Sequence, residues 1–202
     1  MKPFFRLTSA LAGLVVAGGI AFALPVLAQD AQPQSQPQAG APSTPTDVKP
    51  IGDWTVRCFP VTSPSPCDMY EELEDKNSHQ RVLGVSIAYD PGADRNIAQI
   101  AVPLGISIPA GLTLKTDSYQ SPKLPYRRCD RAGCYVELIL PNDIIGSLSK
   151  SGPDGSINVT ADNGKLFSLR FSLNGFSGAH DAMSGLARQK ANKGAAAPAP
   201  KK

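Results

Sequence analysis

The chain has 202 residues, of which 42% are hydrophobic, 18% are charged and 6% are aromatic. Its 20 basic and 17 acidic residues leave a formal charge of +3, an excess too small to indicate binding to nucleic acid. This length and composition exclude a polytopic membrane protein, a coiled coil and a multidomain enzyme, and predict one domain with tails.

The N-terminal segment has the features of a secretory signal peptide. Lys2 and Arg6 precede an uncharged apolar stretch, 7–28, which ends in a cleavage pattern at Ala28. An uncleaved N-terminal anchor is the alternative, because the stretch is long enough to span a bilayer. We expect residues 1–28 to be removed, which leaves no stable membrane span and a mature protein outside the cytoplasm.

Two low-complexity segments bracket the rest of the chain. Residues 29–50 are rich in Gln and Pro, and residues 188–202 are basic and rich in Ala and Pro. Segments of this kind cannot bury enough apolar surface to offset the entropy of ordering, so we predict a disordered tether and a disordered tail. The remaining residues, 51–187, are enough for one hydrophobic core.

The central segment is predicted to be mainly β. Short alternating or apolar runs are separated by Pro, Gly, Asn and Asp, a pattern typical of antiparallel sheets. The predicted strands are 54–59, 67–73, 81–89, 97–102, 112–116, 135–140, 157–161 and 166–173. Within 81–89, the bulky residues Leu83, Val85, Ile87 and Tyr89 alternate with smaller ones and should face the core.

The connections and helices complete the predicted fold. Asp162-Asn163-Gly164 is typical of a tight hairpin turn, and 105–111 should be an irregular crossing. Residues 141–149 form a short predicted helix, and Ser177 should cap a second helix that runs to about Gln189. The apolar stripe of that helix contains Ala179, Ala182, Met183, Leu186 and Ala187. The predicted class is an antiparallel β-sandwich-like domain with a short helix and a C-terminal helix packed on it, although a barrel is not separated from a sandwich.

The four cysteines are Cys58, Cys67, Cys129 and Cys134. An even number of cysteines in an exported chain predicts disulfides, and three connectivities are open. Local pairing of Cys58 with Cys67 and of Cys129 with Cys134 is the simplest, and each bridge would add roughly 2–3 kcal/mol. Zinc binding and thiol exchange are the alternatives, but the first pair is nine residues apart and a Cys-x-x-Cys motif is absent.

A search for catalytic residues finds no convincing set. His180, Asp181 and Ser184 superficially resemble a triad, but adjacent residues on a helix point about 100° apart, so Asp181 could not orient His180. We therefore predict no catalytic residue, no cofactor and no metal. The alternative is an envelope polysaccharide- or peptide-acting hydrolase that uses carboxylates from Glu71, Glu72, Asp117 or Glu137.

A basic cluster surrounds the second cysteine pair. It comprises Lys123, Arg127, Arg128 and Arg131. We take these residues as a candidate interaction surface, with ordinary solvated loops as the alternative.

Several short motifs occur in a characteristic order along 51–187. They are Gly52-Asp53-Trp54, Cys58, Cys67-Asp68-Met69, Leu104-Gly105-Ile106, Pro109-Ala110-Gly111, Tyr126, Cys129, Gly133-Cys134, Leu173 and Gly175-Phe176. The set resembles the invasion-associated locus B family of exported Gram-negative bacterial proteins. The resemblance implies a compact, mainly β exported domain and an association with host-cell invasion, and it transfers no catalytic residue.

These observations together predict a non-enzymatic, exported, disulfide-stabilised binding protein, and the resemblance implies that it lies in the periplasm, is secreted or lies at the outer surface of a Gram-negative bacterium. Its partner would be an unknown protein or a component of the envelope or of the host surface.

Overall fold

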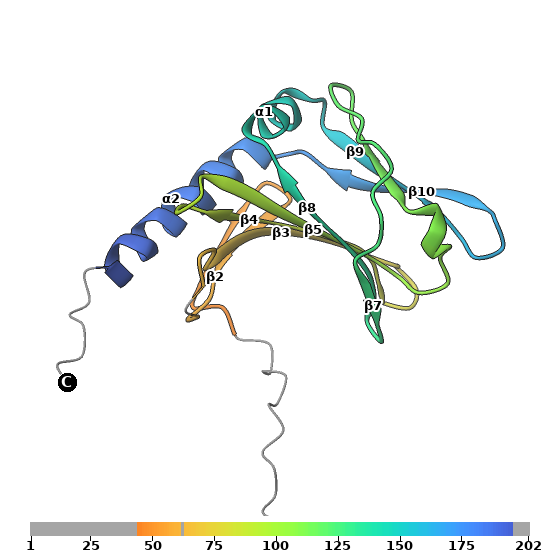
Figure 1. Cartoon of the computed structure of the whole chain (residues 1–202), viewed down its shortest axis with the longest axis horizontal. Coiled ribbons are helices and arrows are strands. Elements are labelled where there is room, and N and C mark those ends of the chain that lie inside the picture. The colour runs from red at the N-terminus through yellow and green to blue at the C-terminus, as the bar shows by residue number, and fades with distance from the viewer. Residues whose placement is uncertain (1–43, 62, 196–202) are drawn as a thin grey trace, which may run out of the picture. The chain divides into compact units, whose positions relative to one another are not determined.

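The computed structural model describes residues 44–61 and 63–195, and Figure 1 shows their arrangement. The strands are β1 (Asp47–Ile51), β2 (Trp54–Cys58), β3 (Cys67–Glu74), β4 (Arg81–Asp90), β5 (Arg95–Val102), β6 (Leu112–Lys115), β7 (Arg128–Asp130), β8 (Gly133–Leu140), β9 (Asp154–Thr160) and β10 (Leu166–Ser172). The helices are the 3₁₀ turn η1 (Ile108–Ala110), α1 (Asn142–Lys150) and α2 (Phe176–Ala195).

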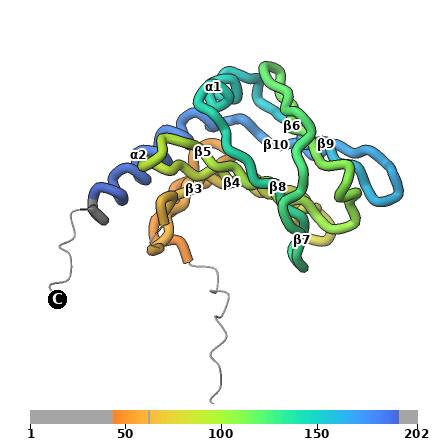
Figure 2. Tube along the Cα trace, viewed as in Figure 1, coloured from red at the N-terminus to blue at the C-terminus, as the bar shows by residue number. Residues whose placement is uncertain are grey.

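The strands form two antiparallel sheets. The large sheet has seven strands in the order β1-β2-β3-β4-β5-β8-β7, and the small sheet has three in the order β10-β9-β6. Helix α2 packs against β1 to β4, and β10 contacts β3 and β4. Figures 1 and 2 show both α-helices and the small sheet on one side of the large sheet. The mainly β class and the packed C-terminal helix are confirmed. The two sheets form separate layers.

The core lies between the two sheets and α2. The predicted inward residues of β4, Leu83, Val85, Ile87 and Tyr89, are all buried, which confirms the alternation. Trp54 is fully buried at the centre, where the indole Nε1 donates a hydrogen bond to the Ser172 carbonyl at 3.0 Å. Burying so large a side chain contributes several kcal/mol, and its polar atom has the partner that burial demands.

The two predicted helices are present. Ile145 and Leu148 of α1 are buried, as are Ala179, Met183 and Ala187 of α2, so the apolar stripe faces the core as expected. Helix α2 begins at Phe176, however, and Ser177 lies within its first turn rather than at the cap. The 105–111 crossing contains η1, and the 162–164 turn joins the paired strands β9 and β10, as predicted.

Two domain boundaries were wrong. Residues 47–50 of strand β1 lie inside the predicted tether, and α2 continues to Ala195, well into the predicted tail. Long-range contacts hold both extensions, because Lys190 Nζ lies 3.0 Å from Asp47 Oδ2 and the Arg188 guanidinium stacks on Tyr89. The predicted signal peptide, 29–43 of the tether and 196–202 of the tail lie outside the described residues. In the part of the chain that is described, no helix is both long and apolar enough to cross a membrane.

Candidate interaction face

Two disulfides join neighbouring strands of the large sheet. Cys58 of β2 is bonded to Cys67 of β3, and Cys129 of β7 is bonded to Cys134 of β8. Both pairs are directly opposite one another in the register of the sheet. The structure therefore has the local connectivity that spacing favoured. Each bridge joins the two strands of a hairpin, and the second one lies next to Arg127, Arg128 and Arg131 in the chain.

The β7–β8 hairpin could not close in its observed form without Gly133. This residue has a φ of 140°, and a Cβ atom here would collide with the Val102 carbonyl oxygen of β5. A side chain would therefore push the hairpin tip away from the sheet. The close approach places Cys134 in the core and leaves Arg128, Asp130 and Arg131 exposed.

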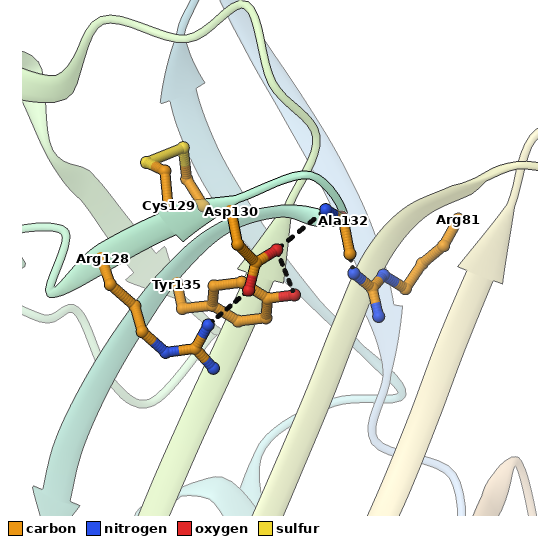
Figure 3. Close-up of a disulfide and its surroundings, with 7 residues drawn as sticks. Arg81, Arg128, Cys129, Asp130, Ala132 and Tyr135 are labelled. Atoms are coloured by element: carbon orange, nitrogen blue, oxygen red, sulfur yellow. Dashed lines mark hydrogen bonds and ion pairs between the residues drawn. A yellow bond between two sulfur atoms is a disulfide. The ribbon is translucent and has the colours of Figure 1, made fainter. Parts of the chain in front are cut away.

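Arg128, Asp130 and Tyr135 form one interlocked group on the outside of this hairpin, as Figure 3 shows. The Arg128 guanidinium lies 3.9 Å from the centre of the Tyr135 ring and pairs with Asp130 at 2.6 Å. The Ala132 amide and the Tyr135 hydroxyl donate to Asp130, at 2.8 and 3.3 Å. Chiefly because of the Ala132 amide, the pKa of Asp130 lies below its usual value, so the carboxylate stays ionised and holds Arg128 over the ring.

The predicted basic cluster is divided by the fold. Arg127 and Arg128 both lie 3.9 Å from Glu137 of β8 and form one pair of neighbours. Arg131 lies at the hairpin tip, where it lines a cavity together with Arg81. Lys123 lies elsewhere, with its side chain close to Gly111 after η1. Arg81 was missed by the sequence reasoning because it is separated from the cluster by about 50 positions.

A second stack of the same kind lies on β2 and β3. The Arg57 guanidinium lies 3.9 Å from the centre of the Tyr70 ring, and Arg57 forms a two-pronged pair with Asp68 at 3.0 and 2.6 Å. The Ser86 hydroxyl of β4 donates to the same carboxylate at 2.9 Å. Sequence reasoning also missed this stack, since its members become neighbours only through strand pairing.

Both stacks lie on the side of the large sheet that faces away from α2 and the small sheet. We call this side the outer face. The register aligns its side chains in three rows across the strands, Arg57-Asp68-Ala88-Ile97-Ile139, Thr55-Tyr70-Ser86-Gln99-Glu137 and Glu72-Gly84-Ala101-Tyr135-Arg128. Strand β4, which lies between the two arginine–tyrosine stacks, contributes only the small residues Gly84, Ser86 and Ala88 to these rows. Figure 1 shows no helix or strand of the described residues covering this face.

The residues considered for hydrolysis are dispersed. Glu71 points towards the inner side between the sheets, whereas Glu72 and Glu137 belong to the outer face. Asp117 lines a cavity of about 430 Å³ beside the small sheet, where the other carboxylate, Asp154, lies 3.8 Å from Arg170. The four predicted carboxylates thus do not share one site. Within the described residues, no group of three or more His, Cys, Asp or Glu is arranged to hold a metal ion.

The residues that resemble a triad have other partners. His180 Nε2 lies 2.8 Å from the Asn96 side-chain oxygen, and Ser184 donates to the Asp181 carbonyl at 3.2 Å. The His180 Nδ1 atom is 3.9 Å from the exposed Asp181 carboxylate, beyond hydrogen-bonding distance. His180 therefore links α2 to β5 through Asn96.

Comparisons with known proteins agree with this architecture. Residues 54–184 match the model of the invasion associated locus B (IalB) protein family. Invasion protein B homologs of two Brucella abortus strains, 2308 and biovar 1 strain 9-941, are each 27% identical over 137 residues, which cover 67% of this chain and 78% of theirs.

A solved structure shares the fold. The crystal structure of invasion associated protein B from Bartonella henselae superposes with a TM-score of 0.61 at 20% identity, covering 71% of this chain and 99% of that one. Since the family model spans more than half of the sequence, the chain belongs to the invasion associated locus B family.

Proposed function

We propose that this protein is exported and acts, without catalysis, as a disulfide-stabilised interaction protein in the periplasm or at the outer surface of a Gram-negative cell. Its partner is a protein or another component of the envelope or of the host surface. The names of the relatives support a role in invasion, and paired cysteines support an oxidising compartment.

One observation supports the binding role: two arginine–tyrosine stacks stand on the same face of the large sheet, which no helix or strand of the described residues covers. Arginine and tyrosine are enriched among residues that dominate binding energy, because they offer large rigid surfaces together with hydrogen-bond donors. Arg57 and Arg128 are each held over a ring by a carboxylate, so little side-chain entropy remains to be lost when a partner binds.

Photo-cross-linking in intact cells tests the binding role. A photoreactive residue at Ile139, which is 57% exposed on the outer face, should give one reproducible adduct, whereas the same residue at the exposed Ser168 of β10 should not. The Arg57→Gln and Arg128→Gln variants should weaken that adduct. Equal labelling from Ile139 and Ser168, or none from Ile139 under several growth conditions, would contradict the proposed face.

Export is tested separately. The intact mass of protein isolated from its own cells should correspond to removal of residues 1–28 and should rise by the mass of four hydrogens on reduction. An unprocessed chain with four free thiols would contradict export, whatever the cross-linking result.

A further inference from the structure

The arginines in the described part of the chain differ in their ion pairs. Most of them lie within ion-pair distance of a carboxylate, namely Arg57, Arg95, Arg127, Arg128, Arg170 and Arg188. Arg81 and Arg131 have no carboxylate of the described residues within that distance. Unpaired guanidinium groups are expected on a protein surface, but these two occur together.

Arg81 and Arg131 line the same cavity, which has a volume of about 550 Å³. The cavity lies at the end of the large sheet, where an Arg81 nitrogen donates to the Ala132 carbonyl at 2.9 Å. Figure 3 shows how this bond directs Arg81 towards the tip of the β7–β8 hairpin. The backbone bond fixes the position of Arg81 without neutralising its charge. Two guanidinium groups therefore line one site, and one of them is fixed in place; paired guanidinium groups recognise phosphate or carboxylate groups.

The rest of the cavity wall includes aliphatic groups. Pro103 and Leu104 line it beside the two arginines, and Leu104 is 56% exposed. A free inorganic anion would gain nothing from this wall. An anion that carries an aliphatic chain would contact the guanidinium groups and the apolar surface together.

Further aliphatic side chains are exposed at the same end of the molecule. The Gly105 carbonyl accepts a hydrogen bond from the Asp162 amide at 3.0 Å, so the Leu104 segment lies against the β9–β10 hairpin. That hairpin exposes Leu166 at 74%, and η1 exposes Ile108 at 47%. Figure 1 shows the hairpin, η1 and the tip of β7 at one end. Aliphatic residues on separate loops match a flat apolar layer better than they match a groove-filling ligand.

The charges at this end favour an anionic surface, although not uniformly. Lys123 and Lys165 are exposed, while the Asp130 carboxylate is paired with Arg128, which balances its charge. Asp162 remains on the hairpin, and Glu74 lies opposite Arg81 in the β3–β4 ladder. The attraction should therefore be local to the cavity rather than spread over the whole end.

We propose that this cavity binds the acidic headgroup of a membrane lipid. The oxyanion lies between Arg81 and Arg131, and Leu104, Ile108 and Leu166 contact the outer acyl region of the bilayer. This inference goes beyond the proposed function, because it assigns a lipid ligand to residues outside the two stacks. Arg81 lies at the border of the outer face, since its Cδ atom and the Tyr70 hydroxyl would each lie 3.3 Å from a Cβ atom built on Gly84.

Vesicle co-sedimentation tests the proposal with the protein as isolated after export. The protein should sediment with vesicles of phosphatidylcholine and phosphatidylglycerol in preference to vesicles of phosphatidylcholine alone. Each cation close to an anionic membrane contributes about 1 kcal/mol, so Arg131→Gln should weaken binding about fivefold. The matched control is Arg170→Gln, which removes an exposed charge from the small sheet and should change binding far less. Leu104→Ser should weaken vesicle binding while leaving the thermal midpoint unchanged.

Three results would overturn the proposal. Equal loss of binding in Arg131→Gln and Arg170→Gln would indicate general charge attraction. Binding of inorganic phosphate with no preference for anionic vesicles would indicate a free anion. Binding of a soluble peptide that ends in leucine with a free carboxylate, without vesicle binding, would indicate a protein ligand. None of these results depends on the cross-linking outcome at Ile139.

Discussion

Gly52 and Gly175 lie back to back, although 122 positions separate them in the chain. A Cβ atom built on either glycine would lie 2.9 Å from the Cα atom of the other. Close to these glycines in the chain, the rings of Trp54 and Phe176 pack edge to face with their centroids 5.4 Å apart. The Gly-Asp-Trp and Gly-Phe motifs are therefore two halves of one junction between β2 and α2.

Replacing Gly175 should destabilise the protein markedly. Its φ is 81°, and a Cβ atom would lie 2.5 Å from the Ile51 carbonyl oxygen, so Gly175→Ala brings both backbone strain and a clash. We expect a loss of about 2 kcal/mol or more in the free energy of unfolding, measured by urea denaturation.

Gly185 provides the matched control for that substitution. It lies within α2, and a Cβ atom there would have no neighbour within 4 Å. Gly185→Ala should stabilise the protein by about 0.5–1 kcal/mol, since alanine is the better helix former. Equal effects of the two substitutions would show that the back-to-back contact contributes nothing.

Glu71 should make the protein less stable as the pH rises. One of its oxygens accepts a hydrogen bond from the Ser172 amide at 2.7 Å, while the other is buried and has no hydrogen-bond partner among the described residues. Burial, followed by the charges of Asp53 and Asp154, raises the pKa of Glu71 to about 7 from an ordinary 4.5. The folded state therefore holds this proton more tightly, and the resulting stabilisation is complete below pH 4.5 and lost as the pH rises through 7.

The Glu71→Gln variant should retain its stability over that interval. Because the carboxyl group is partly solvated, we expect a gain of only about 1 kcal/mol at pH 8 and little change at pH 4.5. Thermal unfolding of both proteins at the two pH values measures the difference. A gain that is the same at both values would assign the effect to packing rather than to ionisation.

His180 should have the opposite pH dependence. Burial beside Asn96 lowers the pKa of His180, with a smaller contribution from Arg188, whereas Asp181 acts in the other direction. The unfolded chain therefore takes up a proton before the folded one does. Stability should be complete above about pH 6.5 and should fall as the pH drops below it.

NMR titration of the His180 ring protons in the folded protein measures this directly. The His180→Phe variant should lose that pH dependence and about 1–3 kcal/mol of stability, because it leaves the fully buried Asn96 oxygen without this partner. An ordinary pKa for His180 in the folded protein would contradict the prediction.

The two disulfides should differ in their resistance to reduction. Cys58, Cys67 and Cys134 are buried, whereas Cys129 is exposed. A thiolate must reach a sulfur atom, so a mild reductant should open Cys129–Cys134 in the folded protein and leave Cys58–Cys67 intact until the protein unfolds. Alkylation followed by peptide mass spectrometry identifies the order. Simultaneous loss of both bridges from the folded protein would be inconsistent with this difference in access.

Most of the strands were predictable because their alternation is set by burial on one side. Strand β1 was not, since four of its five residues are exposed and Pro50 gives it the composition of a linker. It is an edge strand, where proline is tolerated because only one side of the backbone is paired. The last six residues of α2, 190–195, were missed for a related reason: past Ala187 the helix is held by Arg188 and Lys190, whose partners are distant in the sequence.

Only one of the two stacks on the outer face could be anticipated from the sequence. Arg127, Arg128 and the second cysteine pair are neighbours along the chain, so their cluster could be identified. Arg57 and Tyr70 come together through the β2–β3 register, which no single strand specifies. The small outward residues of β4, Gly84, Ser86 and Ala88, were the sequence pattern that could have indicated this face. A strand with large residues on one side and small residues on the other leaves space for neighbouring side chains or a partner over the small residues.

The ion pair between Lys190 and Asp47 brings the points at which the backbone enters and leaves the domain to one corner. A circular permutant that joins these two ends through a short glycine-serine linker, and opens the chain within 161–165, should keep the order of strands in both layers. The same proximity means that reporters attached at the two ends would approach each other in the folded protein and separate when it unfolds.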